Sequence, residues 1–236
     1  MTKQRNKIVE LTNTSVSAAF DKETELLKQI QKGELEQALL LWQTQEDTLV
    51  LPGSNKWQKT PELEEILQNL GWKILSRRTG GAPVPQTSGV INLSHIYLWQ
   101  DQESYSIPIA YRKLCDTLAE FFDSYGVSTQ VHATDFSYCD GDYNLNINGK
   151  KVVGTAQRVV LKHGGGSIVL VQACILIDAI MEILVEPVNL CYQHNDNADQ
   201  IKADVHTCLF EHIEQRPSTQ ALFQTLINVF LTSSSK

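Results

Sequence analysis

The sequence contains no paired cysteines of the kind that disulfide frameworks or zinc sites require. Its five cysteines are an odd number and include no C-x-x-C pair; they are Cys115, Cys139, Cys174, Cys191 and Cys208. A secreted disulfide scaffold or a structural zinc site needs such pairing. We therefore expect a reducing compartment and no metal.

The sequence also lacks long apolar runs and an excess of positive charge. Its first ten residues, M-T-K-Q-R-N-K-I-V-E, have no signal-peptide core, and Gln172, Asp178 and Glu182 interrupt the longest apolar run, 168–185. The net charge of -7 argues against general nucleic-acid binding. These absences predict a cytoplasmic protein without a membrane or nucleic-acid partner.

The composition is ordinary for a globular protein, and a chain of 236 residues is long enough to bury a core. Residues 1–20 are polar and predict a loosely ordered lead-in, whereas 21–236 predict a single domain. Apolar periodicity predicts helices over 21–41 (divided at Gly33), 61–70, 106–125, 178–184, 201–214 and 218–231. Strands are expected over 48–51, 72–75, 89–99, 127–132, 143–147, 150–154, 159–162 and 168–177. Hairpins with helices laid over them predict an α+β fold with a mixed β-sheet and covering helices.

One hairpin stands out because it carries two lysines. Asn148-Gly149 is the strongest short signal for a two-residue turn, since both central residues need positive φ. The expected register places Asn146 opposite Lys151 and Asn144 opposite Val153. Alternation along the strand then predicts that Lys150 and Lys151 lie on opposite faces, so that one lysine can face solvent while the other points inward.

Cys139 differs from the other cysteines because its neighbours are polar and include glycine. A thiol close to cations is the setting in which a thiolate becomes a nucleophile. If the strand ran straight, Cys139 would lie ~23 Å from Asn146, the partner of Lys151. Only a fold-back at Asp140-Gly141 brings it to Lys151. Three of the others, Cys115, Cys174 and Cys208, lie in apolar runs and are expected to be buried small hydrophobes.

Two glycine-rich segments offer ligand-binding loops. In Arg77-Arg78-Thr79-Gly80-Gly81, paired glycines allow close approach to the backbone and an arginine can bind a carboxylate or phosphate, although a solvated surface turn fits equally well. The run after His163 has three glycines but lacks the phosphate-loop spacing. His163 itself is either a catalytic base or, more simply, a packing residue.

Several stretches together resemble the biotin/lipoate protein ligase superfamily, in its lipoate ligase and octanoyltransferase branch. I-L-S-R-R-T-G-G-A-P-V is similar to the ligand loop of that branch, and G-K-K-V-V-G-T-A-Q-R is similar to its lysine segment. Y-C-D-G-D-Y-N-L and G-V-I-N-L-S-H-I resemble stretches of the cysteine-dependent transferases. The departures are Asp140 where proline is usual, Asn144 where aspartate is usual, and no histidine-aspartate pair after Val84.

By position, the resemblance implies that Cys139 is the acyl-accepting nucleophile and that Lys151 contacts the acyl carbonyl. The residues that it places around the acyl ligand are Arg77, Arg78, Thr79, Gly80, Gly81, Asn92, Gly154, Ala156 and His163. Among these, Gly80 and Gly81 are expected to form a wall of the acyl tunnel, with Arg77 or Arg78 steering the acceptor.

The resemblance predicts an acyltransferase that moves an octanoyl or lipoyl group between carrier proteins through a cysteine thioester. The donor would be acyl carrier protein or glycine cleavage H protein, and the acceptor a lysine on the lipoyl domain of a 2-oxoacid dehydrogenase. No cofactor is then required. The alternatives are a lipoate-protein ligase that uses ATP and Mg²⁺ to form an acyl-adenylate, and a catalytically silent member that binds carriers or lipoate.

Overall fold

The computed structural model describes residues 5–54, 56–99, 105–162 and 165–233. The helices are α1 (Val16–Gln31), α2 (Pro61–Asn69), α3 (Ile107–Asp123), α4 (Met181–His194) and α5 (Thr219–Ser233), with short 3₁₀ turns at Ala203–Val205 and Leu209–Glu211. The strands are β1 (Asn6–Leu11), β2 (Gln37–Trp42), β3 (Thr48–Leu51), β4 (Lys73–Ser76), β5 (Val84–Gln86), β6 (Val90–Leu98), β7 (Gln130–Val131), β8 (Leu145–Ile147), β9 (Lys150–Leu161) and β10 (Ser167–Leu176).

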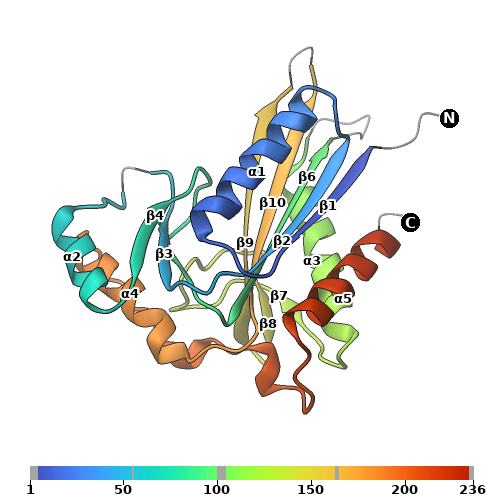
Figure 1. Ribbon diagram of the computed structural model, residues 1–236. Coiled ribbons are helices and arrows are strands. Elements are labelled where there is room, and N and C mark those ends of the chain that lie inside the picture. The colour runs from blue at the N-terminus through green and yellow to red at the C-terminus, as the bar shows by residue number, and fades with distance from the viewer. Residues whose placement is uncertain (1–4, 55, 100–104, 163–164, 234–236) are drawn as a thin grey trace.

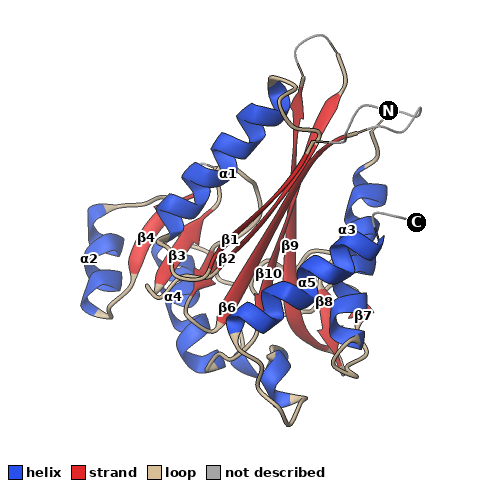
Figure 2. Ribbon diagram, turned by 45° about the vertical axis from the view of Figure 1, so that its right-hand side comes forward, coloured by secondary structure: helices blue, strands red, loops and turns tan. Residues whose placement is uncertain are grey.

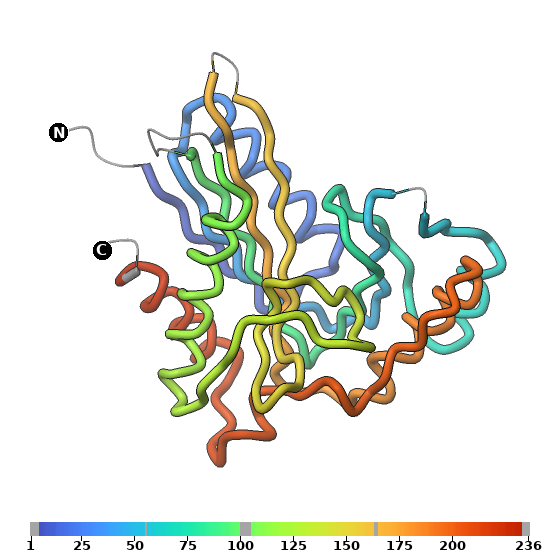
Figure 3. Tube along the Cα trace, turned by 180° about the vertical axis from the view of Figure 1, so that it is seen from behind, coloured from blue at the N-terminus to red at the C-terminus, as the bar shows by residue number. Residues whose placement is uncertain are grey.

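Among the described residues, these strands form two sheets (Figure 1). The larger sheet has seven strands in the order β1-β2-β6-β10-β9-β8-β7, and the smaller has three in the order β4-β3-β5. In the larger sheet the β1–β2 pair is parallel and the other pairs are antiparallel. Helix α1 covers one face of this sheet, and α3 and α5 cover the other (Figures 2 and 3). The predicted α+β fold with a mixed sheet and covering helices is confirmed.

Local sequence signals explain where the elements begin. Thr60 caps α2 through its hydroxyl, which accepts a hydrogen bond from the Leu63 amide at 3.2 Å, and Pro61 fills the first helical position. At the β8–β9 turn, Asn148 and Gly149 have φ of 50° and 77°, which is the conformation that this dipeptide favours.

The predicted hairpin register is half right. Asn146 lies opposite Lys151, as expected, but a bulge between Leu145 and Asn146 places Leu145, rather than Asn144, opposite Val153. The bulge releases Asn144 from strand pairing, and its side chain serves the turn described below.

Two expectations near the N-terminus are wrong. The described part of the lead-in is ordered, because β1 pairs with β2 along its whole length and α1 already begins at Val16. The apolar run expected to continue the helix to 41 is instead strand β2, whose residues from Ala38 to Trp42 are all buried. A strand that is covered on both faces is apolar at every position, so its sequence loses the alternation that identifies a strand.

Two expectations near the C-terminus are also wrong. Helix α4 does not end before Pro187 but contains it, because its buried side continues through Val188 and Cys191. The helix expected over 201–214 is an extended segment with two 3₁₀ turns. This segment is held by a bridge between His206 and Lys151, a tertiary contact that periodicity cannot report.

Candidate active site

Lys151 is the second residue of β9 and is fully buried, whereas Lys150 beside it is exposed. The Lys151 ammonium donates hydrogen bonds to the backbone carbonyls of Tyr138 and Cys139, the latter at 2.8 Å. It also lies 4.6 Å from the centre of the Tyr138 ring, a favourable cation–π position. Burial lowers the pKa of Lys151 to about 8, against the opposing effect of the Cys139 and Cys174 thiols.

The chain folds back at Cys139, as bringing this residue to Lys151 requires. Cys139 has φ of 52°, an uncommon value for a residue with a side chain. The Gly141 amide donates to the Cys139 carbonyl at 2.9 Å, which closes the turn. From the outer edge of the large sheet, the segment around Cys139 extends towards the small sheet (Figure 3).

Asn144 holds this turn in a way that an aspartate could not. Its side-chain amide donates to the Cys139 carbonyl at 2.8 Å, and its side-chain carbonyl accepts from the Thr155 amide at 3.2 Å. An ionised carboxylate has no hydrogen to donate. The departure from the usual aspartate therefore suits the geometry of the Cys139 turn.

The Arg77 loop lies directly against the Cys139 thiol. The Arg77 guanidinium donates to the carbonyls of Gly80 and Ala82 at 2.9 and 3.1 Å, and it lies on the same side of Gly81 as the Cys139 thiol. Gly81 has φ of 109°, and a Cβ there would lie 3.2 Å from the Cys139 sulfur and 3.0 Å from the guanidinium. Only glycine lets the two loops approach this closely.

The remaining residues of that loop differ in their placement. Arg78 and Gly80 are exposed, and Thr79 is buried. The Thr79 hydroxyl and the Arg77 Nε are buried atoms without a hydrogen-bond partner among the described residues. Of the two arginines expected to face an acceptor, Arg77 turns inward to the thiol, which leaves Arg78 at the surface.

A narrow cavity runs from Cys139 across the face of the large sheet that α1 covers, with a volume of about 50 Å³ open to the centre of a water molecule. The predicted ligand residues Asn92, Gly154 and Ala156 line it together with Arg77 and Cys139. Lys151 does not itself line the cavity. Its ammonium lies beside Gly154, 3.4 Å from the position that a Cβ of Gly154 would take.

The polar side chains around the cavity are hydrogen-bonded to one another. Gln86 and Asn92 exchange two hydrogen bonds of 3.1 and 2.7 Å. Ser94 and Gln172 both donate to one carboxylate oxygen of Glu23, at 2.6 and 2.7 Å. Because these groups satisfy one another, an apolar ligand in the cavity would leave Gln86, Asn92, Ser94 and Gln172 paired.

Sequence reasoning missed several residues of this site. Cys174, expected to be a buried hydrophobe, lines the cavity and accepts a hydrogen bond from Gln86 at 3.4 Å; burial raises the pKa of its thiol to about 11. His206 stacks on Tyr138 at 4.8 Å, and burial together with the Lys151 charge lowers its pKa to about 4. Cys174 could have been placed in the site by its strand pairing with Gly154. No local sequence signal indicates that His206 lies there.

Three further expectations concern His163, a metal site and a membrane span. His163 lies outside the described residues. Within the described ranges, no group of three histidine, cysteine or acidic side chains is placed to hold a metal ion. None of the helices in the described part of the chain is both long and apolar enough to cross a membrane.

Fold and cavity together define a class of protein. In this class a mixed sheet carries a pocket, and a buried lysine and a glycine-rich arginine loop lie beside it. Residues 15–231 match the family model described as the lipoyl protein ligase A/B catalytic domain. The chain belongs to this family.

Curated relatives include both octanoyl and lipoyl transferases. An octanoyl-[GcvH]:protein N-octanoyltransferase of Macrococcus caseolyticus is 37% identical over 111 residues, 47% of this chain and 39% of the relative. The Geobacillus kaustophilus protein with the same name is 32% identical over 133 residues, 55% and 45% of the two chains. A lipoyl-[GcvH]:protein N-lipoyltransferase of Listeria monocytogenes is 29% identical over 147 residues, 61% and 51%. The matches thus span about half the length of these relatives or less.

Solved structures show the same fold. A lipoate-protein ligase A bound with ATP aligns over 99% of this chain and 86% of its own, with a TM-score of 0.76 and 14% identity. The T. acidophilum protein Ta0514 with bound lipoic acid covers 99% and 87%, with a TM-score of 0.71 and 16% identity. At this identity the likeness is one of fold.

Proposed function

We propose that the protein transfers an octanoyl group between carrier proteins through a thioester on Cys139. The observation that carries the proposal is the position of Cys139: it lines the cavity together with Arg77, its thiol lies on the same side of Gly81 as the Arg77 guanidinium, and its backbone carbonyl is bound by the buried Lys151 ammonium. A cysteine among cations is the setting in which nucleophilic cysteines are found.

In the proposed reaction, the Cys139 sulfur bonds to the acyl carbonyl carbon, and the bond from that carbon to the donor's amine breaks. The thiol proton ends on the leaving amine. A lysine of the acceptor then attacks the thioester and restores the thiol. Since one amide is exchanged for another, the overall reaction is close to thermoneutral and needs no ATP.

Lys151 and Arg77 supply the positive charge for this reaction. Two of the three Lys151 hydrogens are bound to the Tyr138 and Cys139 carbonyls. When the acyl carbonyl arrives, the Lys151 ammonium would give up one of these hydrogen bonds and donate to the developing oxyanion instead. Gly154 has no side chain that would block this contact.

The donor is proposed to be glycine cleavage H protein, because the curated relatives are named for it. The acceptor is proposed to be a lipoyl domain.

The proposal is tested by incubating the protein with octanoyl-H protein in the absence of ATP. We expect a hydroxylamine-sensitive mass increase on the protein, absent in Cys139→Ala and retained in Cys174→Ala, the matched control in which the other thiol of the cavity is removed. An adduct that survives Cys139→Ala contradicts the proposed nucleophile.

The same experiment separates the alternatives. Transfer that requires ATP and is undiminished in Cys139→Ala would indicate a ligase that forms an acyl-adenylate. Binding of the carrier without an adduct, with or without ATP, would indicate a silent member of the family. Running octanoyl and lipoyl donors in parallel shows which acyl group is preferred.

A further inference from the structure

The floor of the cavity is a row of four residues that lies across the strands of the large sheet. Trp42 on β2 pairs with Asn92 on β6, Asn92 with Cys174 on β10, and Cys174 with Gly154 on β9. Directly paired residues share a face of a sheet, and all four line the cavity. Three strand spacings separate Trp42 from Gly154, which is about 14 Å between backbones.

An acyl chain attached to Cys139 enters this row at the Gly154 end. Both residues line the cavity, and the Lys151 ammonium bound to the Cys139 carbonyl lies beside Gly154. An extended eight-carbon chain is about 9 Å long, since each C–C bond of about 1.5 Å advances it by about 1.3 Å. Such a chain, laid across the strands, would end close to the Trp42 indole.

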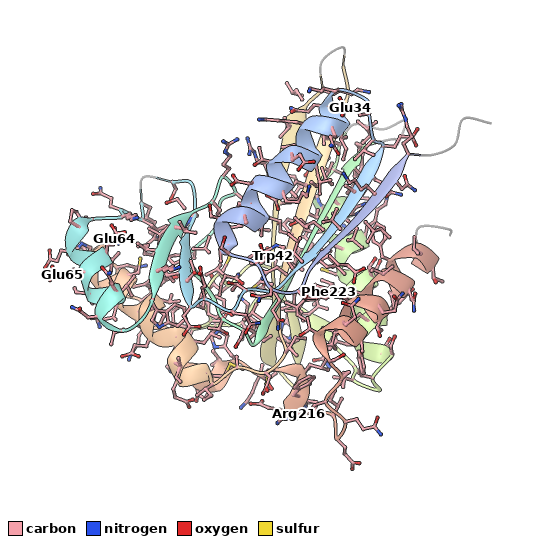
Figure 4. All side chains as sticks on the ribbon, in the orientation of Figure 1. Glu34, Trp42, Glu64, Glu65, Arg216 and Phe223 are labelled. Atoms are coloured by element: carbon pink, nitrogen blue, oxygen red, sulfur yellow. The ribbon has the colours of Figure 1, made fainter. Side chains whose placement is uncertain are left out.

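Phe20 closes the cavity at that end. It projects from α1, and its ring meets the Trp42 ring edge to face with 6.0 Å between centroids. Phe20 also lines a second hollow, a groove beside α1 that is bordered by Leu27, Arg78 and Arg158. Figure 4 shows Trp42 close to one end of α1.

Phe20, Arg77 and Gln172 line both the cavity and the groove, so these three side chains form the partition between them. Arg77 is held by the Gly80 and Ala82 carbonyls, and Gln172 by Glu23. An aromatic ring forms no such bonds, so Phe20 is fixed by packing alone. It is therefore the part of the partition that can be removed without breaking a hydrogen bond.

We propose that Phe20, seated against Trp42, sets the maximum length of the acyl chain at about eight carbons. The identity of the chain as an acyl group rests on the proposed function; the length limit rests on the cavity. Removing the ring would join the cavity to the groove beside α1 and admit longer chains.

The test measures thioester formation with hexanoyl, octanoyl, decanoyl and dodecanoyl donors in the wild type and in Phe20→Ala. We expect the wild-type rate to rise up to octanoyl and to fall at least tenfold at dodecanoyl. In Phe20→Ala the dodecanoyl-to-octanoyl ratio should increase at least tenfold. Leu27→Ala is the matched control, because Leu27 is on the same helix and lines the groove but not the cavity; its profile should equal the wild type.

Binding of free fatty acids with 6 to 14 carbons, measured by calorimetry, reports the length limit without chemistry. Affinity should rise about fourfold per methylene up to eight carbons and then stop in the wild type, and continue to rise in Phe20→Ala. If no thioester forms but this binding pattern is found, transfer fails and the length limit stands. An unchanged profile in a folded Phe20→Ala variant, or no break near eight carbons in the wild type, overturns the inference.

Discussion

The two faces of the seven-stranded sheet are built for different tasks. Towards α3 and α5, residues such as Leu39, Leu41 and Val171 pack against phenylalanines of both helices in one continuous apolar core. Towards α1, the same strands form a smaller apolar cluster with that helix, and beside it they present Asn92, Cys174 and other small or polar residues around a cavity. Figure 4 shows Trp42 on the side of α1 and Phe223 on α5.

This difference shows how one sheet combines stability with a binding site. The packed face contributes apolar burial, the main source of folding free energy. The hollow face, the one with the cavity, buries less apolar surface. Its polar groups are hydrogen-bonded to one another, so the loss of folding free energy stays small. Mutations on the first face should therefore act on stability, and mutations on the second on activity.

The largest expected effect is on the packed face. Phe121→Ala removes a fully buried ring and should lower the free energy of unfolding by about 3–5 kcal/mol, measured by urea denaturation. The rate of thioester formation per folded molecule should not change. Phe20→Ala, the same substitution on the hollow face, should cost clearly less, because Phe20 is partly exposed. Equal losses from the two variants would contradict the comparison.

Lys151→Met should show the reverse pattern. We expect the rate of thioester formation to fall about 100-fold or more, equivalent to ~3 kcal/mol, because a donor to the oxyanion is lost. The free energy of unfolding should change by about 1 kcal/mol or less, since removing a buried cation offsets the lost hydrogen bonds. Lys151→Arg, which keeps the charge, is the control; a fully active Lys151→Met variant would exclude a role in the reaction.

The Gln86–Asn92 pair tests whether mutual pairing protects the hollow face. Gln86→Leu leaves the buried Asn92 amide without this partner and should cost about 1–3 kcal/mol of unfolding free energy. The double variant Gln86→Leu, Asn92→Leu should cost less than the sum of the two single variants, which a double-mutant cycle measures. Additive losses would mean that the two amides act independently.

The smallest effect is a pH dependence of the rate. Lys151 is charged below its pKa of about 8 and loses its charge as the pH rises through that value. The rate of the wild type relative to Lys151→Arg should therefore fall by up to tenfold per pH unit above 8, because the arginine stays charged. Taking this ratio removes the pH dependence of the steps that do not involve residue 151. A ratio that does not change with pH would argue against a role of the Lys151 charge in the reaction.

Local sequence determined much of the fold. The Asn148-Gly149 turn, the cap of α2 at Thr60, and the opposite directions of Lys150 and Lys151 follow from propensities and alternation. Strand β2 was beyond this reasoning, because burial on both faces removes the alternation. The extended segment around His206 was also beyond it, since its conformation depends on a contact with Lys151.

The site divides in the same way. By itself, the sequence identified the Arg77 loop, the hairpin lysine and the cysteine turn, because each is a short segment with its own chemical pattern. Only the tertiary structure decided that Arg77 turns inward to the thiol, that Lys151 binds the Cys139 carbonyl, and that Cys174 and Phe20 line one cavity. These contacts join residues far apart in the chain, and their geometry is set by strand pairing and helix packing rather than by local preference.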